Sequence, residues 1–188
     1  NNCIPQPAGP NLDAISERLM YRLQYRNFVT HESLVVNHTV DVDGSDHAGI
    51  RWYELRNDGS GWSVYQQGTY APDSENRWMG SVAMDGSGNM ALGYSVSSAS
   101  TNPSIRYTGR LAGDPLGTMP QGESEIVAGG GSQTNSAARW GDYSSMSVDP
   151  VDQCTFWYTQ EYYSATSSAN WKTRIASFKF PTCSPPAA

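Results

Sequence analysis

Two Arg-Trp pairs, about 62 residues apart, carry side chains that can bind a ligand. Asp142 and Tyr143 lie just beyond the second pair, after Gly141, and the full set is Arg77, Trp78, Arg139, Trp140, Asp142 and Tyr143. A guanidinium can hold a carboxylate through two parallel hydrogen bonds, and an indole offers an apolar face to a sugar ring. We therefore predict that these six residues form the ligand-binding region. The alternative is that the repeated Arg and Trp hold neighbouring parts of the fold together.

Three acidic residues could supply catalytic carboxylates. A retaining glycosidase needs a nucleophile and an acid, and the candidates are Asp142, Glu54 beside Tyr53, and Glu161 beside Tyr162. Acidic residues at strand ends are more often solvated or paired with a base. Whether the chain is an enzyme therefore stays open, and a non-catalytic role is favoured.

A short acidic loop could hold Ca²⁺. Asp41, Asp43 and Asp46 surround Gly44, and calcium prefers oxygen ligands. The spacing does not match the twelve-residue EF-hand loop, and Asp and Gly are common in hairpin turns without any metal. Calcium is the only cofactor that the sequence suggests.

The elements that must position these residues repeat along the chain. They are stretches of about five to nine residues, rich in β-branched and aromatic side chains and bounded by Gly, Pro, Asn or Asp, which is typical of strands. They group into units at 18–71, 76–130 and 138–181, with a lead-in at 1–17 and a tail at 182–188. The stretches at 19–25 and 139–149 open the first and third units, and further strands are predicted at 31–40, 89–95 and 104–108. Only residues 12–20 have a pattern compatible with a helix.

Four strands per unit, repeated at this spacing, is the pattern of β-propeller blades. The sequence thus predicts an all-β fold with about three four-stranded blades; a β-sandwich is the alternative. Since propellers usually have about four to eight blades and the third unit lacks a fourth strand, we expect part of a six- to seven-bladed propeller. Upstream blades or another chain would complete it.

Three cysteines make an odd count. Cys154 opens the second strand of the third unit and Cys183 follows its third strand, so we predict a disulfide between them that fixes the end of this unit. Cys3 is then unpaired or bonded outside this chain. This use of cysteine fits an exported protein.

The charge balance excludes some partners. Eighteen acidic and 12 basic residues give a net charge of −6, and no Lys/Arg cluster is present that could neutralise phosphates, so we expect no nucleic acid. No apolar run of about 18 residues occurs, so we expect no membrane span. The first residues lack the basic and apolar regions of a signal peptide, which would have been removed or lie upstream.

Residues 139–144, followed by 148–150 and 156–158, resemble the secreted bacterial sialidase-like β-propellers that carry BNR repeats. The similarity runs from about Arg51 onward and concerns the fold more than the chemistry. The Asp-box of sialidases, Ser-x-Asp-x-Gly-x-x-Trp, is missing; in the nearest stretch, residues 57–62, the Trp is too close to the Asp. The group includes sialidases, other glycan-active enzymes, lectins and adhesive domains.

Three functions follow as hypotheses. The first is an extracellular, non-catalytic recognition or adhesion module that binds a glycan or a protein. The second is a sialidase-like glycoside hydrolase whose active site is completed by additional blades. The third is a self-assembling structural subunit, since open strand edges are templates for association.

Overall fold

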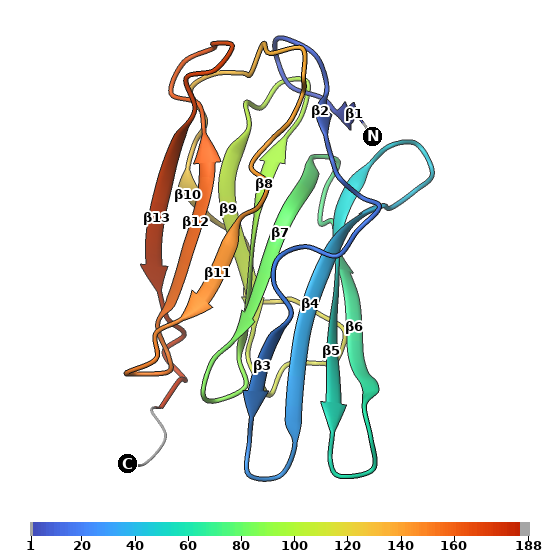
Figure 1. Ribbon diagram of the computed structural model, residues 1–188, viewed down its shortest axis with the longest axis vertical. Coiled ribbons are helices and arrows are strands. Elements are labelled where there is room, and N and C mark those ends of the chain that lie inside the picture. Colours follow the sequence, from blue (N-terminus) through green and yellow to red (C-terminus); the bar gives the residue numbers. More distant parts are fainter. Residues whose placement is uncertain (1, 185–188) are drawn as a thin grey trace.

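The computed structural model describes residues 2–184 and contains thirteen β-strands and no helix in that range (Figure 1). The all-β class predicted from the sequence is confirmed. The expected helix at 12–20 is wrong, because Leu12–Asp13 pairs as strand β2 with strand β1 (Asn2–Ile4). Residue 1 of the lead-in and residues 185–188 of the tail lie outside the described residues. No described segment is a helix long and apolar enough to cross a membrane.

Three larger antiparallel sheets follow the N-terminal pair, and each lies within one of the three sequence units. The first sheet holds β3 (Gln24–Asn27), β4 (Glu32–Asp41), β5 (Ala48–Asn57) and β6 (Ser63–Tyr70). The second holds β7 (Asn76–Met84), β8 (Met90–Ser97), β9 (Ser104–Arg110) and β10 (Ser124–Val127). The third holds β11 (Ser145–Val148), β12 (Phe156–Tyr162) and β13 (Lys172–Phe178).

Two first strands are shorter than the sequence suggests. The expected strand at 19–25 begins only at Gln24, because Met20 turns into a buried cluster with the N-terminal segment. The expected strand at 139–149 begins only at Ser145, and the preceding residues form a loop. That loop contains Arg139 and Asp142.

Side-chain hydrogen bonds to the backbone join β7 to residues in, or just before, the first strands of the other two sheets. Ser81 on β7 donates to the carbonyl of Tyr21, at 3.2 Å, and accepts from the amide of Met146 on β11, at 2.8 Å. Ser144 donates to the carbonyl of Met79, at 2.8 Å. Similar contacts thus connect β7 with the segment before β3 and with the start of β11, and Figure 1 shows β7 between the other two sheets.

Large side chains fill the space between successive sheets. Between the first and second sheets, Ile50 and Trp52 pack with Leu92 and Tyr94. Between the second and third sheets, Phe156 and Tyr158 pack against small residues of β8. A Cβ added at Gly93 would lie 2.5 Å from the Tyr158 ring, so this position has room only for glycine.

Gly93→Ala is therefore expected to lower the free energy of unfolding by about 1–3 kcal/mol, the usual cost of overpacking. Tyr158 is 1% exposed, so its ring is enclosed by the packing between the two sheets. Urea denaturation would measure the change. Gly113→Ala is the matched control, because its Cβ meets no atom within 4 Å. If Gly93→Ala and Gly113→Ala had equal urea midpoints, the second and third sheets would be able to move apart at Gly93 at little cost.

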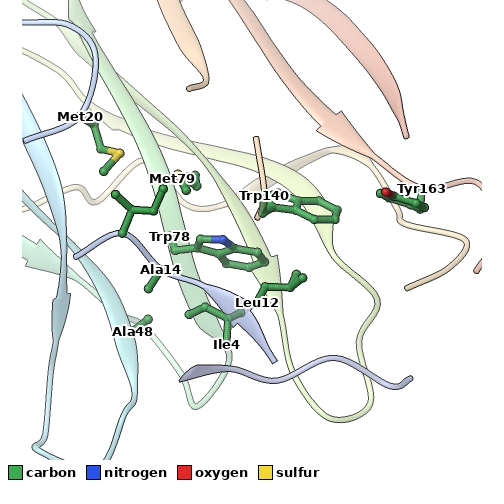
Figure 2. Close-up of a cluster of buried hydrophobic side chains, with 10 residues drawn as sticks. Ile4, Leu12, Ala14, Met20, Ala48, Trp78, Met79, Trp140 and Tyr163 are labelled. Atoms are coloured by element: carbon green, nitrogen blue, oxygen red, sulfur yellow. The ribbon is translucent and has the colours of Figure 1, made fainter. Parts of the chain in front are cut away.

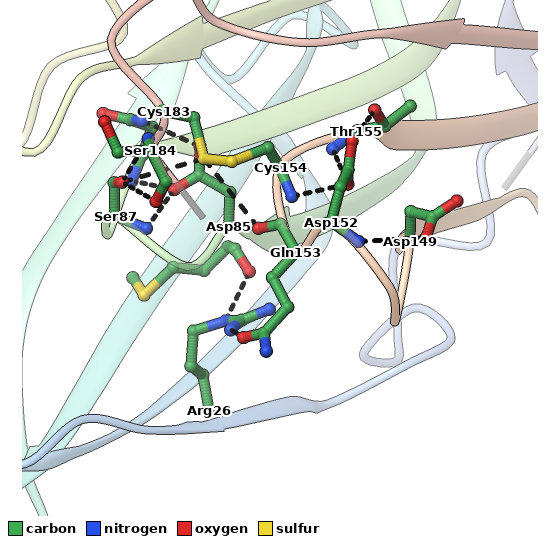
Figure 3. The surroundings of a disulfide bond; sticks show 12 residues. Arg26, Asp85, Ser87, Asp149, Asp152, Gln153, Cys154, Thr155, Cys183 and Ser184 are labelled. Carbon is green, nitrogen blue, oxygen red and sulfur yellow. Dashed lines mark hydrogen bonds between the residues drawn. A yellow bond between two sulfur atoms is a disulfide. The ribbon is translucent and has the colours of Figure 1, made fainter. Parts of the chain in front are cut away.

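The turns at one end of the sheets are held by aspartates and by the predicted disulfide. Asp85 accepts from the amides of Ser87 and Asn89, both at 2.9 Å. Cys154 and Cys183 are bonded, with Cα atoms 5.6 Å apart, beside this turn (Figure 3). The disulfide prediction is confirmed. Cys3 carries no disulfide in the described part of the chain and is partly buried.

Candidate functional site

The two predicted tryptophans lie in the core. Trp78 is 0% and Trp140 is 1% exposed, and their ring centroids are 6.0 Å apart. Figure 2 shows Ile4 and Leu12 of the N-terminal segment beside them. The chain's own first residues thus cover these indoles, and both side chains serve mainly in packing; Trp140 also lies at the wall of a groove.

Arg77 is also buried, and its guanidinium is fully engaged. It donates two hydrogen bonds to Asp73, at 2.7 and 2.9 Å, and two to Glu123, at 2.8 and 3.2 Å. Burial by itself would lower the pKa of Arg77, but these two carboxylates raise it above its ordinary value. Arg77 therefore joins β7 to the segments that precede β7 and β10.

Arg139, the counterpart of Arg77 in the third unit, is at the surface. Its side chain is 61% exposed and it donates a hydrogen bond to Asp142, whose side chain is 18% exposed. Tyr143 is 43% exposed next to them. Of the six predicted ligand-binding residues, the structure thus leaves Arg139, Asp142 and Tyr143 accessible.

A groove of about 220 Å³ opens beside Arg139. Asp142 and Glu161 lie in its wall and also line an adjacent hollow of about 240 Å³ that includes Tyr143. Trp171, which is 57% exposed, borders the groove from the loop before β13. The polar lining is completed by Gln133, Asn135 and Ser168. The sequence reasoning missed these last four residues; an isolated Trp ending a polar loop at 164–171 was the available signal.

Local backbone geometry fixes this groove. Gly141 has a φ of +44°, in the left-handed region that favours glycine, and a Cβ there would overlap the side chain of Gln160. Gln160 is held in place because its Oε1 accepts from the amide of Glu161, at 2.8 Å. Gln133 donates to the carbonyl of Arg139, at 2.7 Å. Through these contacts the loop with Arg139 and Asp142 packs against β12, the strand that contains Glu161.

The carboxyl group of Glu161 has an unusual pKa. Burial raises the pKa most, the nearby charge of Asp142 adds to the rise, and a hydrogen bond from the Gly141 backbone lowers it; together they bring the pKa from 4.5 to about 7. The group can therefore gain or lose a proton near neutral pH. This is the property expected of a general acid or base, or of a pH-dependent ligand contact.

Glu161→Gln is expected to stabilise the protein by about 1–2 kcal/mol above pH 7, a value reduced for the partial exposure of the side chain. Because the folded-state pKa is raised, the wild type loses stability as pH rises from about 4.5 to 7 and has the full penalty above 7. The glutamine variant lacks this penalty, so the two proteins should be equally stable at about pH 4. Thermal unfolding from about pH 4 to 8 would measure this, and parallel pH profiles would contradict it.

Glu54 lies elsewhere, on β5 of the first sheet. It is 0% exposed and accepts hydrogen bonds from Ser33 at 3.0 Å, Arg56 at 2.6 Å and Gln66 at 2.6 Å. The structure therefore brings Asp142 and Glu161 to one groove and leaves Glu54 in a buried network. Its oxygens are occupied by structural contacts.

The acidic loop at 41–46 binds its own backbone. Asp41 accepts from the amide of Gly44, at 2.9 Å, and Asp43 accepts from the amide of Ser45, at 2.9 Å. Across residues 2–184, no group of three or more His, Cys, Asp or Glu side chains is arranged to hold a metal ion. These contacts are those of a hairpin turn.

Comparisons with protein-family models, with curated proteins and with solved structures found no match for this chain. The groove at Arg139 and Trp171 is therefore the basis for the functional proposal.

Proposed function

We propose that this chain is an extracellular recognition module that binds a carbohydrate in the groove between Arg139 and Trp171. The observation that carries the proposal is the exposed indole of Trp171 beside a polar wall of Arg139, Asp142 and Glu161. An aromatic face can stack on a sugar ring, while planar polar side chains can bind its hydroxyls. The Cys154–Cys183 disulfide supports the extracellular location.

The arrangement of sheets supports a propeller as the framework. Successive antiparallel sheets pack face to face, and the hydrogen bonds of Ser81 and Ser144 link β7 to the residues just before β3 and β11. In a propeller the first strands of the blades gather around a central axis. We propose that these sheets are three blades of a larger ring, completed by other blades.

The proposal is tested by glycan-array binding and titration with the best ligand. Trp171→Ala should weaken binding about tenfold, equivalent to about 1.4 kcal/mol, and leave the melting temperature unchanged because the side chain is exposed. Trp62→Ala is the matched control: Trp62 is 44% exposed but lies in the first sheet's β5–β6 turn, outside the groove. The proposed site would be rejected if Trp171→Ala and Trp62→Ala lost glycan affinity equally, or if the wild type bound no glycan.

A second candidate function is glycoside hydrolysis in the same groove. It is favoured by Glu161, whose pKa of about 7 is raised in part by Asp142, since glycosidases use two carboxyl groups with separated pKa values. Product analysis with polysaccharides and chromogenic glycosides would test it. Turnover by the wild type that Glu161→Gln abolishes would support an enzyme; binding without turnover supports the recognition module.

A further inference from the structure

The outer edge of β13 differs from its counterparts in the other sheets. The third strands of the first and second sheets, β5 and β9, are each covered by a fourth strand. In residues 2–184, β13 pairs only with β12. One side of β13 therefore presents unpaired backbone amides and carbonyls, which can pair with an added strand.

This edge is basic, although the chain carries a net charge of −6. Lys172 and Arg174 are both exposed, and neither forms an ion pair with a described residue. They alternate along β13, so they lie on the same face of the sheet. Lys179, the only other lysine of the chain, follows the strand. Ile175, which is 67% exposed, lies on the opposite face.

The second sheet shows how such an edge is covered in this protein. There Arg106 on β9 pairs with Glu123 at 2.8 Å and with Glu125 at 3.5 Å. Glu125 is directly opposite Arg106 in the β9–β10 register, and Glu123 is two residues earlier. Strand β10 and the residue just before it thus bring two acidic side chains, two positions apart, to Arg106 on the third strand.

We propose that β13 binds an acidic extended segment of another polypeptide as an antiparallel fourth strand. Acidic residues two positions apart would face Lys172 and Arg174, and an apolar residue just before the first of them would lie opposite Ile175. A second copy of β13 fits poorly, because it would bring further lysines and arginines to a basic edge. This edge adjoins the Arg139 groove, because Trp171 precedes Lys172 and Thr173 lines the neighbouring hollow, but the proposed pairing uses the backbone of β13 and does not depend on carbohydrate binding.

The probe is a fluorescent ten-residue peptide with Val-Glu-Thr-Glu at its centre, titrated against the 188-residue chain by fluorescence polarisation. We expect saturable binding that weakens with salt. The same peptide N-methylated along the backbone should not bind, because it cannot complete the ladder. Lys172→Glu combined with Arg174→Glu should weaken binding at least tenfold and should bind the Val-Lys-Thr-Lys peptide instead.

The matched control is Arg18→Glu combined with Arg22→Glu, which makes the same charge change at exposed residues outside β13. This variant should bind the Val-Glu-Thr-Glu peptide nearly as the wild type does, and circular dichroism should show both variants folded. The proposal is overturned if the peptide does not bind at about 1 mM, a limit for weak association. Equal binding of the N-methylated peptide overturns it too. If analytical ultracentrifugation showed a dimer that the peptide does not dissociate, the β13 edge would instead be the contact with a second copy of this chain.

Discussion

Arg77→Ala is expected to lower the free energy of unfolding by about 3–5 kcal/mol, the usual cost of removing one partner of a buried ion pair. The Arg77 side chain is 0% exposed and holds Asp73 and Glu123 from two separate segments. Without it, Glu123 keeps contacts with Tyr94, at 2.7 Å, and Arg106, at 2.8 Å, but loses its most buried cation. Urea denaturation followed by tryptophan fluorescence would measure the change.

Arg139→Ala is the matched control for this experiment. Arg139 precedes Trp140 as Arg77 precedes Trp78, yet its side chain is 61% exposed, and exposed ion pairs add little to stability. Its unfolding midpoint should stay close to that of the wild type. If Arg77→Ala were as stable as Arg139→Ala, the buried network around Asp73 and Glu123 would have no structural role.

Removing the Cys154–Cys183 bond by a double change to Ser is expected to cost about 3–4 kcal/mol. The two residues are 29 positions apart, and a cross-link of this span restricts the unfolded chain by about that amount. The bond also holds the end of the chain near Ser87, whose Oγ accepts from the amide of Ser184, at 3.1 Å (Figure 3). Urea denaturation of the variant and of the reduced wild type should give the same midpoint.

Cys3→Ser serves as the control, because Cys3 is free in the structure. Its unfolding midpoint should match that of the wild type, and reductant should lower it equally. Alkylation of the native wild type followed by mass spectrometry should find one free thiol, at Cys3. A stable double variant would mean that contacts after β13 hold the segment without the bond.

Arg77 and Arg139 occupy similar positions in their repeats, but one side chain is buried and the other is exposed. In the second unit, Asp73 and Glu123 pair with Arg77, which therefore stabilises the fold. At the third unit, the arginine borders an open groove with Asp142 and Trp171. Ligand binding is therefore proposed at one unit only, where polar residues and an exposed indole coincide.

Much of the secondary structure could be predicted from the sequence. Alternating apolar and polar residues with Gly, Asn and Asp turns act locally, so strands such as β4, β8 and β9 lie close to where the pattern placed them. The disulfide followed from the same strand assignment, because it placed Cys154 and Cys183 at the ends of neighbouring strands. Local conformation was therefore largely determined by the sequence itself.

Only the tertiary structure decided which of these residues are buried. Trp78 and Trp140 have the side chains of a binding site, but residues 4–14, far away in the chain, cover them. Glu161 was one of three acidic candidates in the sequence, and only its burial where the loop at Gly141 packs against β12 raises its pKa and sets it apart from Glu54. Burial, hydrogen-bond partners and pKa depend on contacts between residues distant in sequence, and a repeated local pattern carries no information about those contacts.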